Sequence, residues 1–181
     1  MRIRGPFCDL RTVAPDDAAF ILSLRLDDVR NKFLSPVRAD IAAQAEWLRE
    51  YQAREAAGAE FYFAIEAPTG TAVGTVRVYD FVDDSFSWGS WVIRPGVSPH
   101  VAVASALLVY EFAFGQLGFA QSHFEVLKGN DRVIAFHRRL NAEPVREDDR
   151  AVYFVLTREA YEVVREKYRK YLHEPAVPSA R

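Results

Sequence analysis

The sequence predicts a protein that combines helices and strands, of fold class α/β (α+β), in which helices cover both faces of a mixed sheet. Two patterns predict it: three consecutive strand patterns in the middle of the chain, and alternating helix and strand patterns after them. The size agrees, because 181 residues with 50% hydrophobic and 27% charged side chains fit one globular unit with a sizeable core. We therefore expect a single domain over residues 1–172 and a frayed tail over residues 173–181.

The first third of the chain predicts one strand and two helices. Residues 7–13 mix apolar and polar side chains as a first strand does. Pro15-Asp16-Asp17 then places proline and acids where a helix N-terminus accepts them, and this helix should run through Leu26. Helical spacing resumes at Asp40 and lasts until Gly58, which predicts the second helix.

After the second helix the pattern changes to a period of two residues. Phe61, Phe63 and Ile65 alternate with other side chains, and a Pro-Thr-Gly turn separates them from a partner strand over residues 72–81. A pair of aspartates makes the next turn, and Ser85 to Ile93 reads as a third strand rich in aromatic residues. These three strands predict an antiparallel meander.

The remaining part of the chain alternates between helix and strand patterns. A long helix from about His100 to Leu117 is apolar on nearly every face, so it must be buried on more than one side. We then expect a strand over residues 124–127, a helix over 130–140, one or two strands ending with residues 151–156, and a helix over 158–171.

The composition excludes several classes of function. The net charge of −2 gives no general attraction to nucleic acid or to an anionic membrane surface. The basic N-terminus lacks the apolar core of a secretory signal, and the apolar run from Val101 to Phe114 is too short to cross a bilayer. Cys8 is the only cysteine, so neither an internal disulfide nor a metal cluster of thiolates is expected. We expect a cytoplasmic protein without a metal, bound to neither nucleic acid nor membrane.

The most informative stretch begins at Trp91. A strand runs through a short loop directly into the apolar helix, so unpaired main-chain N–H groups and the positive helix end face one point. This arrangement predicts an anion site, although a plain strand-to-helix connection fits the same residues. Phosphate sites usually carry glycines, and the small residues Ala102 and Ala104 stand here instead.

A second stretch runs from Phe124 to Asn141. Asn130 ends a strand and can cap the next helix, which is the simplest interpretation of it. His137 lies one turn after Val133 and Ile134, which turns it toward the apolar side. Taken without further context, this position is typical of a histidine that is buried in the hydrophobic core.

Together with the order of elements, these two stretches resemble the GNAT superfamily of acetyl-CoA-dependent N-acetyltransferases. The likeness extends from Phe7 to Leu156. Pro99, Ala102 and Ala104 stand at the three signature positions of the family's coenzyme-binding loop, where only Ala104 keeps the family's usual residue, and Asn130 takes the place of its coenzyme-binding asparagine. The resemblance implies a mostly antiparallel sheet and transfer of an acetyl group from acetyl-CoA to a small-molecule amine.

Two further stretches are similar to one branch of that superfamily. Val29-Arg30-Asn31-Lys32 and Glu46-Trp47-Leu48 resemble enzymes that acetylate nucleotide-linked amino sugars for surface polysaccharides, although Gln44 replaces that branch's histidine. Ser87 also stands where relatives often have glutamate. Two other acceptors fit the same reaction: a protein N-terminus or an antibiotic amine. The sequence is also compatible with a non-catalytic module that binds acyl-CoA. A homodimer is compatible with it as well.

The resemblance assigns roles residue by residue. His137 stands where many members carry the tyrosine that protonates the departing thiolate, and an ordinary histidine pKa near ~6.5 suits that step. Candidate bases are Glu125 and His123, which share a strand face, with Asp80 or Asp83 near the strand ends. The residues expected at the coenzyme are Val92 and Ile93 (the oxyanion donors), Ser98, His100, Val101, Ala102, Val103, Ala104, Ser105, Asn130 and Phe136. Those expected at the acceptor are Arg30, Asn31, Tyr79 and Trp88.

Overall fold

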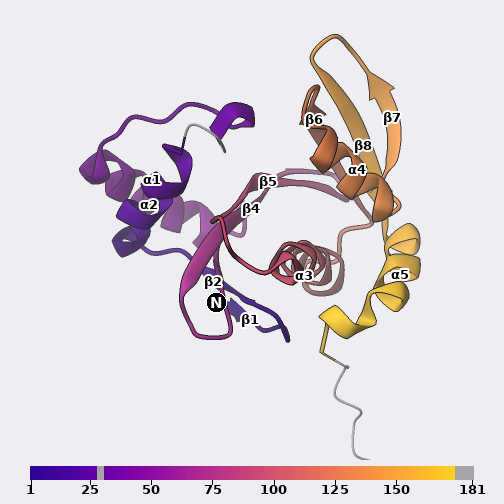
Figure 1. Ribbon diagram of the computed structural model, residues 1–181, viewed down its shortest axis with the longest axis horizontal. Helices are drawn as coiled ribbons and strands as arrows, with labels where there is room; N and C mark the ends of the chain where they lie inside the picture. Colours follow the sequence, from indigo (N-terminus) through magenta and orange to yellow (C-terminus); the bar gives the residue numbers. More distant parts are fainter. Residues whose placement is uncertain (28–30, 174–181) are drawn as a thin grey trace, which may run out of the picture.

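The computed structural model describes residues 1–27 and 31–173, with Asn31 described by its backbone alone (Figure 1). Its strands form one eight-stranded sheet in the order β1-β2-β3-β4-β5-β6-β8-β7. They are β1 (Arg2–Ile3), β2 (Asp9–Thr12), β3 (Phe61–Glu66), β4 (Ala72–Val82), β5 (Ser85–Ile93), β6 (Gln121–Leu127), β7 (Glu143–Glu147) and β8 (Ala151–Thr157). The pair β5·β6 is parallel and the other pairs are antiparallel, so the predicted mixed sheet and its central meander are confirmed.

The helices lie close to the predicted ranges. They are α1 (Ala18–Arg25), α2 (Ile41–Ala56), α3 (Pro99–Tyr110), α4 (Asp131–Arg139) and α5 (Arg158–Lys167), with short turns η1 (Pro15–Asp17), η2 (Asn31–Phe33), η3 (Glu111–Gln116) and η4 (Arg169–Tyr171). The predicted helix over 158–171 ends earlier, at Lys167, and continues as the 3-10 turn η4. The long apolar helix changes to π geometry in η3.

Helices cover both faces of the sheet, as predicted. In Figure 1, α1 and α2 lie together on one side of the sheet, and α3 and α5 lie on the other. Two hydrophobic clusters correspond to this arrangement. The smaller joins α1 and α2 to Tyr62 and Ala64 of β3, and the larger joins α3 and α5 to β4, β5, β6 and β8.

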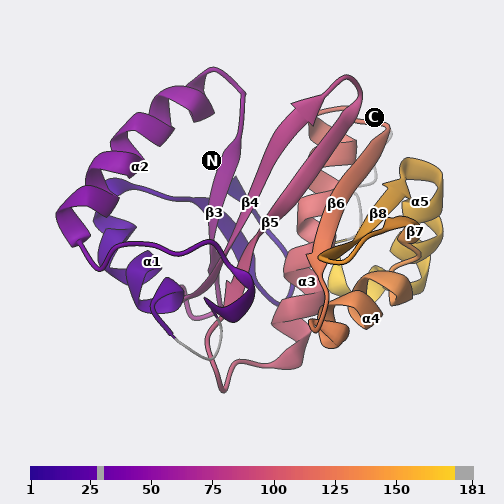
Figure 2. The same cartoon turned by 90° about the horizontal axis from the view of Figure 1, so that it is seen from above.

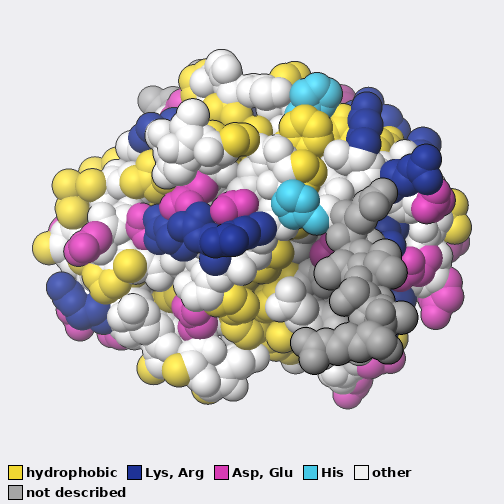
Figure 3. Space-filling model, turned by 90° about the horizontal axis from the view of Figure 1, so that it is seen from below, with side chains coloured by type: hydrophobic (Ala, Val, Ile, Leu, Met, Phe, Trp, Pro, Cys, Tyr) yellow, Lys and Arg dark blue, Asp and Glu magenta, His cyan; other side chains and the backbone are white. Residues whose placement is uncertain are grey.

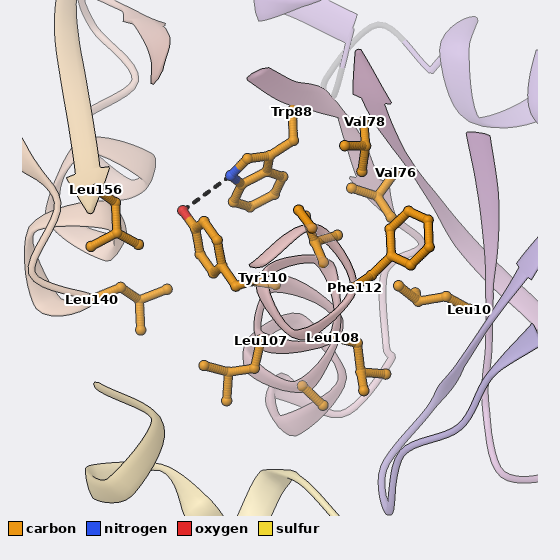
Figure 4. Packing of buried hydrophobic residues seen from close by; sticks show 14 of the residues in the cluster. Leu10, Val76, Val78, Trp88, Leu107, Leu108, Tyr110, Phe112, Leu140 and Leu156 are labelled. Carbon is orange, nitrogen blue, oxygen red and sulfur yellow. Dashed lines mark hydrogen bonds between the residues drawn. The ribbon is translucent and has the colours of Figure 1, made fainter. Parts of the chain in front are cut away.

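Helix α3 is the centre of the larger cluster. Ala104, Leu107, Val109 and Tyr110 on it are fully buried, which confirms the prediction of burial on several sides. Figure 4 shows Trp88 of β5 donating a hydrogen bond from Nε1 to the hydroxyl of Tyr110, over 3.0 Å. This bond satisfies two buried polar groups and fixes β5 against α3.

Charged side chains at the N-terminal edge of the sheet are paired with opposite charges. Arg2 lies 2.6 Å from Glu66, and Arg11 bonds both Glu66 and Asp17. On the face drawn in Figure 3, basic and acidic side chains likewise adjoin one another. Among the described residues, no helix is both long and apolar enough to span a bilayer, and no group of three metal-ligating side chains was found.

Gly74 offers a test of the packing between β4 and β5. A Cβ atom there would lie 2.4 Å from the carbonyl oxygen of Val92, which is main chain and cannot rotate away. We expect Gly74→Ala to lower the free energy of unfolding by about 1–3 kcal/mol in urea denaturation. The matched control is Gly115→Ala, where the added methyl has open space. Equal stability of the two variants would contradict this account of the β4·β5 contact.

Candidate active site

Strand β5 has an open edge over most of its length. It pairs with β6 at two positions, Ser85↔Gln121 and Phe86↔Ser122, and Figure 2 shows the two strands separating toward α3 and α4. A bulge accompanies the separation: the β4·β5 register shifts after Thr75, and Ser90 has a left-handed φ of 48°. Main-chain groups of β5 beyond Phe86 are therefore available to a ligand that carries amides.

The start of α3 is exposed beside that open edge. Ser98 is the N-cap, and its hydroxyl accepts from the N–H of His100 over 3.3 Å. The loop residues 94–96 and 98–100 are exposed. The positive end of the helix dipole is thus at the surface, as an anion site requires. The Val101 N–H donates to the Ser98 carbonyl over 3.0 Å, so an anion bound to the N–H groups of His100 and Val101 would replace their bonds to Ser98.

The predicted coenzyme residues on α3 differ in what they can offer. Val101, Ala104 and Ser105 are buried, so their side chains are not accessible, whereas Ala102 and Val103 are half-buried. Ser105 instead joins α3 to β5, because its hydroxyl accepts from Trp91 Nε1 over 3.1 Å. Val101, Ala104 and Ser105 can therefore contact a coenzyme only through their main-chain atoms.

His100 is engaged elsewhere. Its Nδ1 atom lies 2.9 Å from the hydroxyl of Tyr171, and its ring packs against Phe7 at 5.2 Å. These contacts fasten the end of α5 and η4 to the start of α3. A coenzyme would meet the backbone of His100 rather than its imidazole.

Asn130 and Phe136 lie on the opposite wall. The side chain of Asn130 makes no capping hydrogen bond, so the simplest interpretation of this residue was wrong. Its carbonyl accepts from the N–H groups of Val133 and Ile134, and its side-chain amide is left for a ligand. The ring of Phe136 lies 5.0 Å from that of Trp91, so α4 and β5 touch across the open edge.

His137 is buried among aromatic rings. Its ring lies 4.3 Å from Phe124 and 5.3 Å from Trp88, and the residue is 4% exposed. Burial lowers the pKa of His137 to about 3, and its Nδ1 atom makes no hydrogen bond. The ordinary pKa expected for it was wrong, because the aromatic cage disfavours the charged imidazolium. At neutral pH the ring is neutral.

The two candidate bases on β6 have different partners. His123 lies between two oxygens: Nδ1 is 2.6 Å from Ser85 Oγ, and Nε2 is 3.2 Å from Asp80 Oδ2. Asp80 takes a left-handed φ of 54° at the irregular end of β4. Glu125 instead accepts from Arg150 in a partly exposed ion pair of 2.7 Å. Ser85 was missed by the sequence, because nothing distinguishes a serine at the start of a strand.

The residues predicted at the acceptor are not all available to it. Tyr79 lies over β5, since its hydroxyl is 2.9 Å from where a Cβ on Gly89 would stand. Trp88 is 5% exposed and bonded to Tyr110, so little of its side chain is left for an acceptor, and its contact with the acceptor stays a prediction. Asn31 is placed only as backbone in η2, and Arg30 lies outside the described residues.

Comparison with known proteins fits this geometry. A family model described as an acetyltransferase (GNAT) domain matches residues 9–143. The chain belongs to this family. It is an N-acetyltransferase of the GNAT fold, and GNAT acetyltransferases use acetyl-CoA and act on small-molecule or nucleotide-sugar amines.

Solved structures agree with that membership. FdhC without ligands, a nucleotide-linked sugar GNAT, is 42% identical, with a TM-score of 0.88 over 96% of this chain and 99% of FdhC. A GCN5-related N-acetyltransferase from Brucella melitensis is 15% identical, with a TM-score of 0.77 over 99% of this chain and 88% of its own. RimJ from Mycobacterium smegmatis, bound to CoA-disulfide, is 17% identical, with a TM-score of 0.73 over 92% and 93%. No curated protein matches the chain.

The resemblance predicted from the sequence is thus confirmed, including its likeness to enzymes of nucleotide-linked sugars. The two low-identity structures show the fold alone. The cytoplasmic location, the lack of nucleic-acid and membrane partners and the homodimer remain predictions.

The buried His137 makes stability depend on pH. Its pKa is about 3 in the folded chain and about 6.5 in the unfolded chain, so below pH 6.5 the unfolded chain binds more protons. The free energy of unfolding should fall by about 2 kcal/mol between pH 7 and pH 5. His137→Phe should remove most of that fall, measured by urea denaturation at both pH values. The same fall in the variant would assign it to other groups.

Proposed function

We propose that this GNAT enzyme transfers the acetyl group of acetyl-CoA to the amino group of a nucleotide-linked sugar. The observation that carries the proposal is the 42% identity to FdhC, a nucleotide-linked sugar GNAT, over 96% of the chain. A role in surface polysaccharide synthesis, implied by the sequence resemblance, stays a prediction.

Acetyl-CoA fits the open edge and the exposed helix start. The amides of its pantetheine arm can pair with β5 as an added strand does. Its diphosphate suits the positive dipole end of α3, where the N–H groups of His100 and Val101 can exchange their bonds to Ser98 for bonds to phosphate oxygens, and the side-chain amide of Asn130 can bond to it from the α4 wall. This set of donors matches the two chemical parts of the carrier, amide and anion.

The reaction joins the amine nitrogen to the thioester carbonyl carbon and breaks the C–S bond. A main-chain N–H of β5 near Val92 or Ile93 is the donor to the developing oxyanion, since it is fixed before reaction. The amine must lose a proton to a base, and the thiolate must gain one. His137 is neutral in its cage, so it can orient the leaving group but does not supply imidazolium.

The base we assign is His123, acting through Ser85. When Nε2–H donates to Asp80, Nδ1 is free to accept from the Ser85 hydroxyl. Ser85 stands seven positions before Val92 on β5, roughly 20 Å along the strand, and is 6% exposed, so the amine proton reaches Ser85 Oγ through solvent between β5 and β6 rather than by direct contact. Ser85 Oγ then passes its own proton to His123 Nδ1. The Asp80 carboxylate then stabilises the imidazolium. Glu125 is less suited, because Arg150 already holds its carboxylate.

The acceptor class is tested by offering purified protein acetyl-CoA with three kinds of amine: nucleotide-linked amino sugars, peptides with a free N-terminus, and aminoglycosides. Release of free coenzyme A thiol and mass spectrometry of the acceptor measure the transfer. We expect the nucleotide-linked amino sugars to be acetylated. Preference for either other class overturns the proposal. Coenzyme binding with no transfer to any amine points to the non-catalytic module.

The assignment of the base gives a second test. His123→Ala should lower kcat by roughly 100-fold or more, because an unaided serine cannot take the amine proton efficiently. The control is Glu125→Gln, which removes the other candidate and should leave kcat within about twofold. Full activity of that variant, with unchanged folding by circular dichroism, would exclude His123.

A further inference from the structure

A cavity lies between helices α1 and α2 and the face of the sheet that they cover. Its volume is about 240 Å³. The lining residues that matter here are Arg25, Gln44, Trp47, Tyr62, Arg77 and Ser90. Gln44 and Trp47 stand three residues apart on α2 and so share one face of that helix. None of these residues belongs to the start of α3 or to the His123 cluster.

Three polar atoms on residues that line this cavity are buried without a well-formed hydrogen bond. They are Arg25 Nε, Arg77 Nε and the hydroxyl of Tyr62, none of which has a hydrogen bond of standard geometry; the Tyr62 hydroxyl has weaker side-chain contacts with Thr75 and Arg25. Tyr62 is only 3% exposed. Buried polar groups in folded proteins are nearly always satisfied, so three unsatisfied ones at one cavity require an explanation. A ligand that accepts hydrogen bonds supplies it.

The charge of the lining indicates an anion. Two guanidinium groups line the cavity, and its lining among the described residues includes no Asp or Glu, although Glu60 behind it is paired with Arg77. Burial lowers the pKa of Arg77, and the nearby guanidiniums of Arg54 and Arg25 add to this effect. Glu60 pairs with Arg54 and Arg77, and Arg25 donates to the carbonyl and hydroxyl of Ser35. One carboxylate, Glu60, thus faces the three guanidiniums of Arg25, Arg54 and Arg77, and the positive charge left over would be compensated by an anion between Arg25 and Arg77.

The position of the cavity relates it to the reaction. Ser90, the bulged residue of β5, is part of its lining, and the open edge of β5 continues from Ser90 to Ile93. The phenol of Tyr62 is near the same point: burial raises its pKa, while Thr75 and Arg25 oppose that rise, and Thr75 also bonds the Ser90 carbonyl. An anion held here lies beside the strand where the acceptor amine must react.

We propose that Arg25, Tyr62 and Arg77 bind a phosphate group of the acceptor, and so make the enzyme specific for nucleotide-linked sugars. This inference rests on the proposed function. Guanidinium forks suit phosphate oxygens, and the half-buried indole of Trp47 forms an apolar wall beside them. A sugar amine without a phosphate leaves the three donors unsatisfied.

The kinetic test compares a nucleotide-linked amino sugar with the same amino sugar lacking phosphate. Arg25→Gln and Tyr62→Phe should lower the ratio of their kcat/KM values at least tenfold, as loss of a charge-assisted or buried hydrogen bond does. Tyr62→Phe removes a hydroxyl that makes no hydrogen bond of standard geometry, so its circular dichroism spectrum should match that of the wild type. Arg49→Gln, on the exposed side of α2 and paired with Glu46, removes the same charge and should keep the ratio within twofold. An unchanged ratio in both cavity variants overturns the proposal.

A binding test separates this inference from the proposed function. Millimolar inorganic pyrophosphate is added in the presence of saturating coenzyme A, so that the donor's diphosphate site is already filled. It should raise the melting temperature of the wild type and of Arg49→Gln, and raise it less in Arg25→Gln and Tyr62→Phe. No shift in the wild type, or an equal shift in all four proteins, overturns the anion site. The expected shifts without acetylation of any nucleotide-linked sugar overturn only the proposed function.

Discussion

The separation of β5 from β6 is the constraint on which the candidate site depends. Each strand is held by a different neighbour. Trp88 and Trp91 fasten β5 to α3 through hydrogen bonds to Tyr110 and Ser105, whereas β6 pairs along its whole length with β8. The bulge at Ser90 bends β5 further from the ladder. Two strands that diverge in this way leave a main-chain edge inside the molecule, and only a ligand or solvent can satisfy it.

The sheet that contains β5 separates the charged parts of the two substrates, because their sites lie on opposite faces of it. The start of α3, which suits the diphosphate of acetyl-CoA, belongs to the helix layer on one face of the sheet. The Arg25–Arg77 cavity belongs to α1 and α2, on the opposite face. A donor and an acceptor that both carry phosphates repel each other, and the sheet keeps their charged parts apart. The uncharged reacting groups of the two substrates then meet at β5. The hydrogen-bonded residues Ser85, His123 and Asp80 lie at the other end of the gap, where β5 and β6 are still paired.

Local sequence patterns predicted the helices and strands better than they predicted the surroundings of the candidate site residues. The bounds of β5 and the N-cap of α2 at Asp40 were predictable, because alternation and capping are local signals. Strand β7 lacks an apolar side and is exposed throughout, so no alternation marks it. The low pKa of His137 depends on rings from three other segments, and the contact of His123 with Asp80 depends on one backbone angle. Arg25, Tyr62 and Arg77 come from three elements, so only the folded chain brings them to one cavity.

The altered loop before α3 is consistent with a working donor site. Pro99 occupies the first helical position, where its missing N–H would have no intrahelical partner. Pro99 therefore removes no hydrogen bond from the helix, but it removes one N–H donor that a ligand could otherwise use. Ala102 adds a methyl group, and it is only half-buried, so the group lies at the surface. Binding must then depend less on a close glycine cradle and more on the helix dipole, the Asn130 amide and the open edge of β5. Because β5 also carries the oxyanion donor, a carrier bound mainly through that edge is aligned for transfer as it binds.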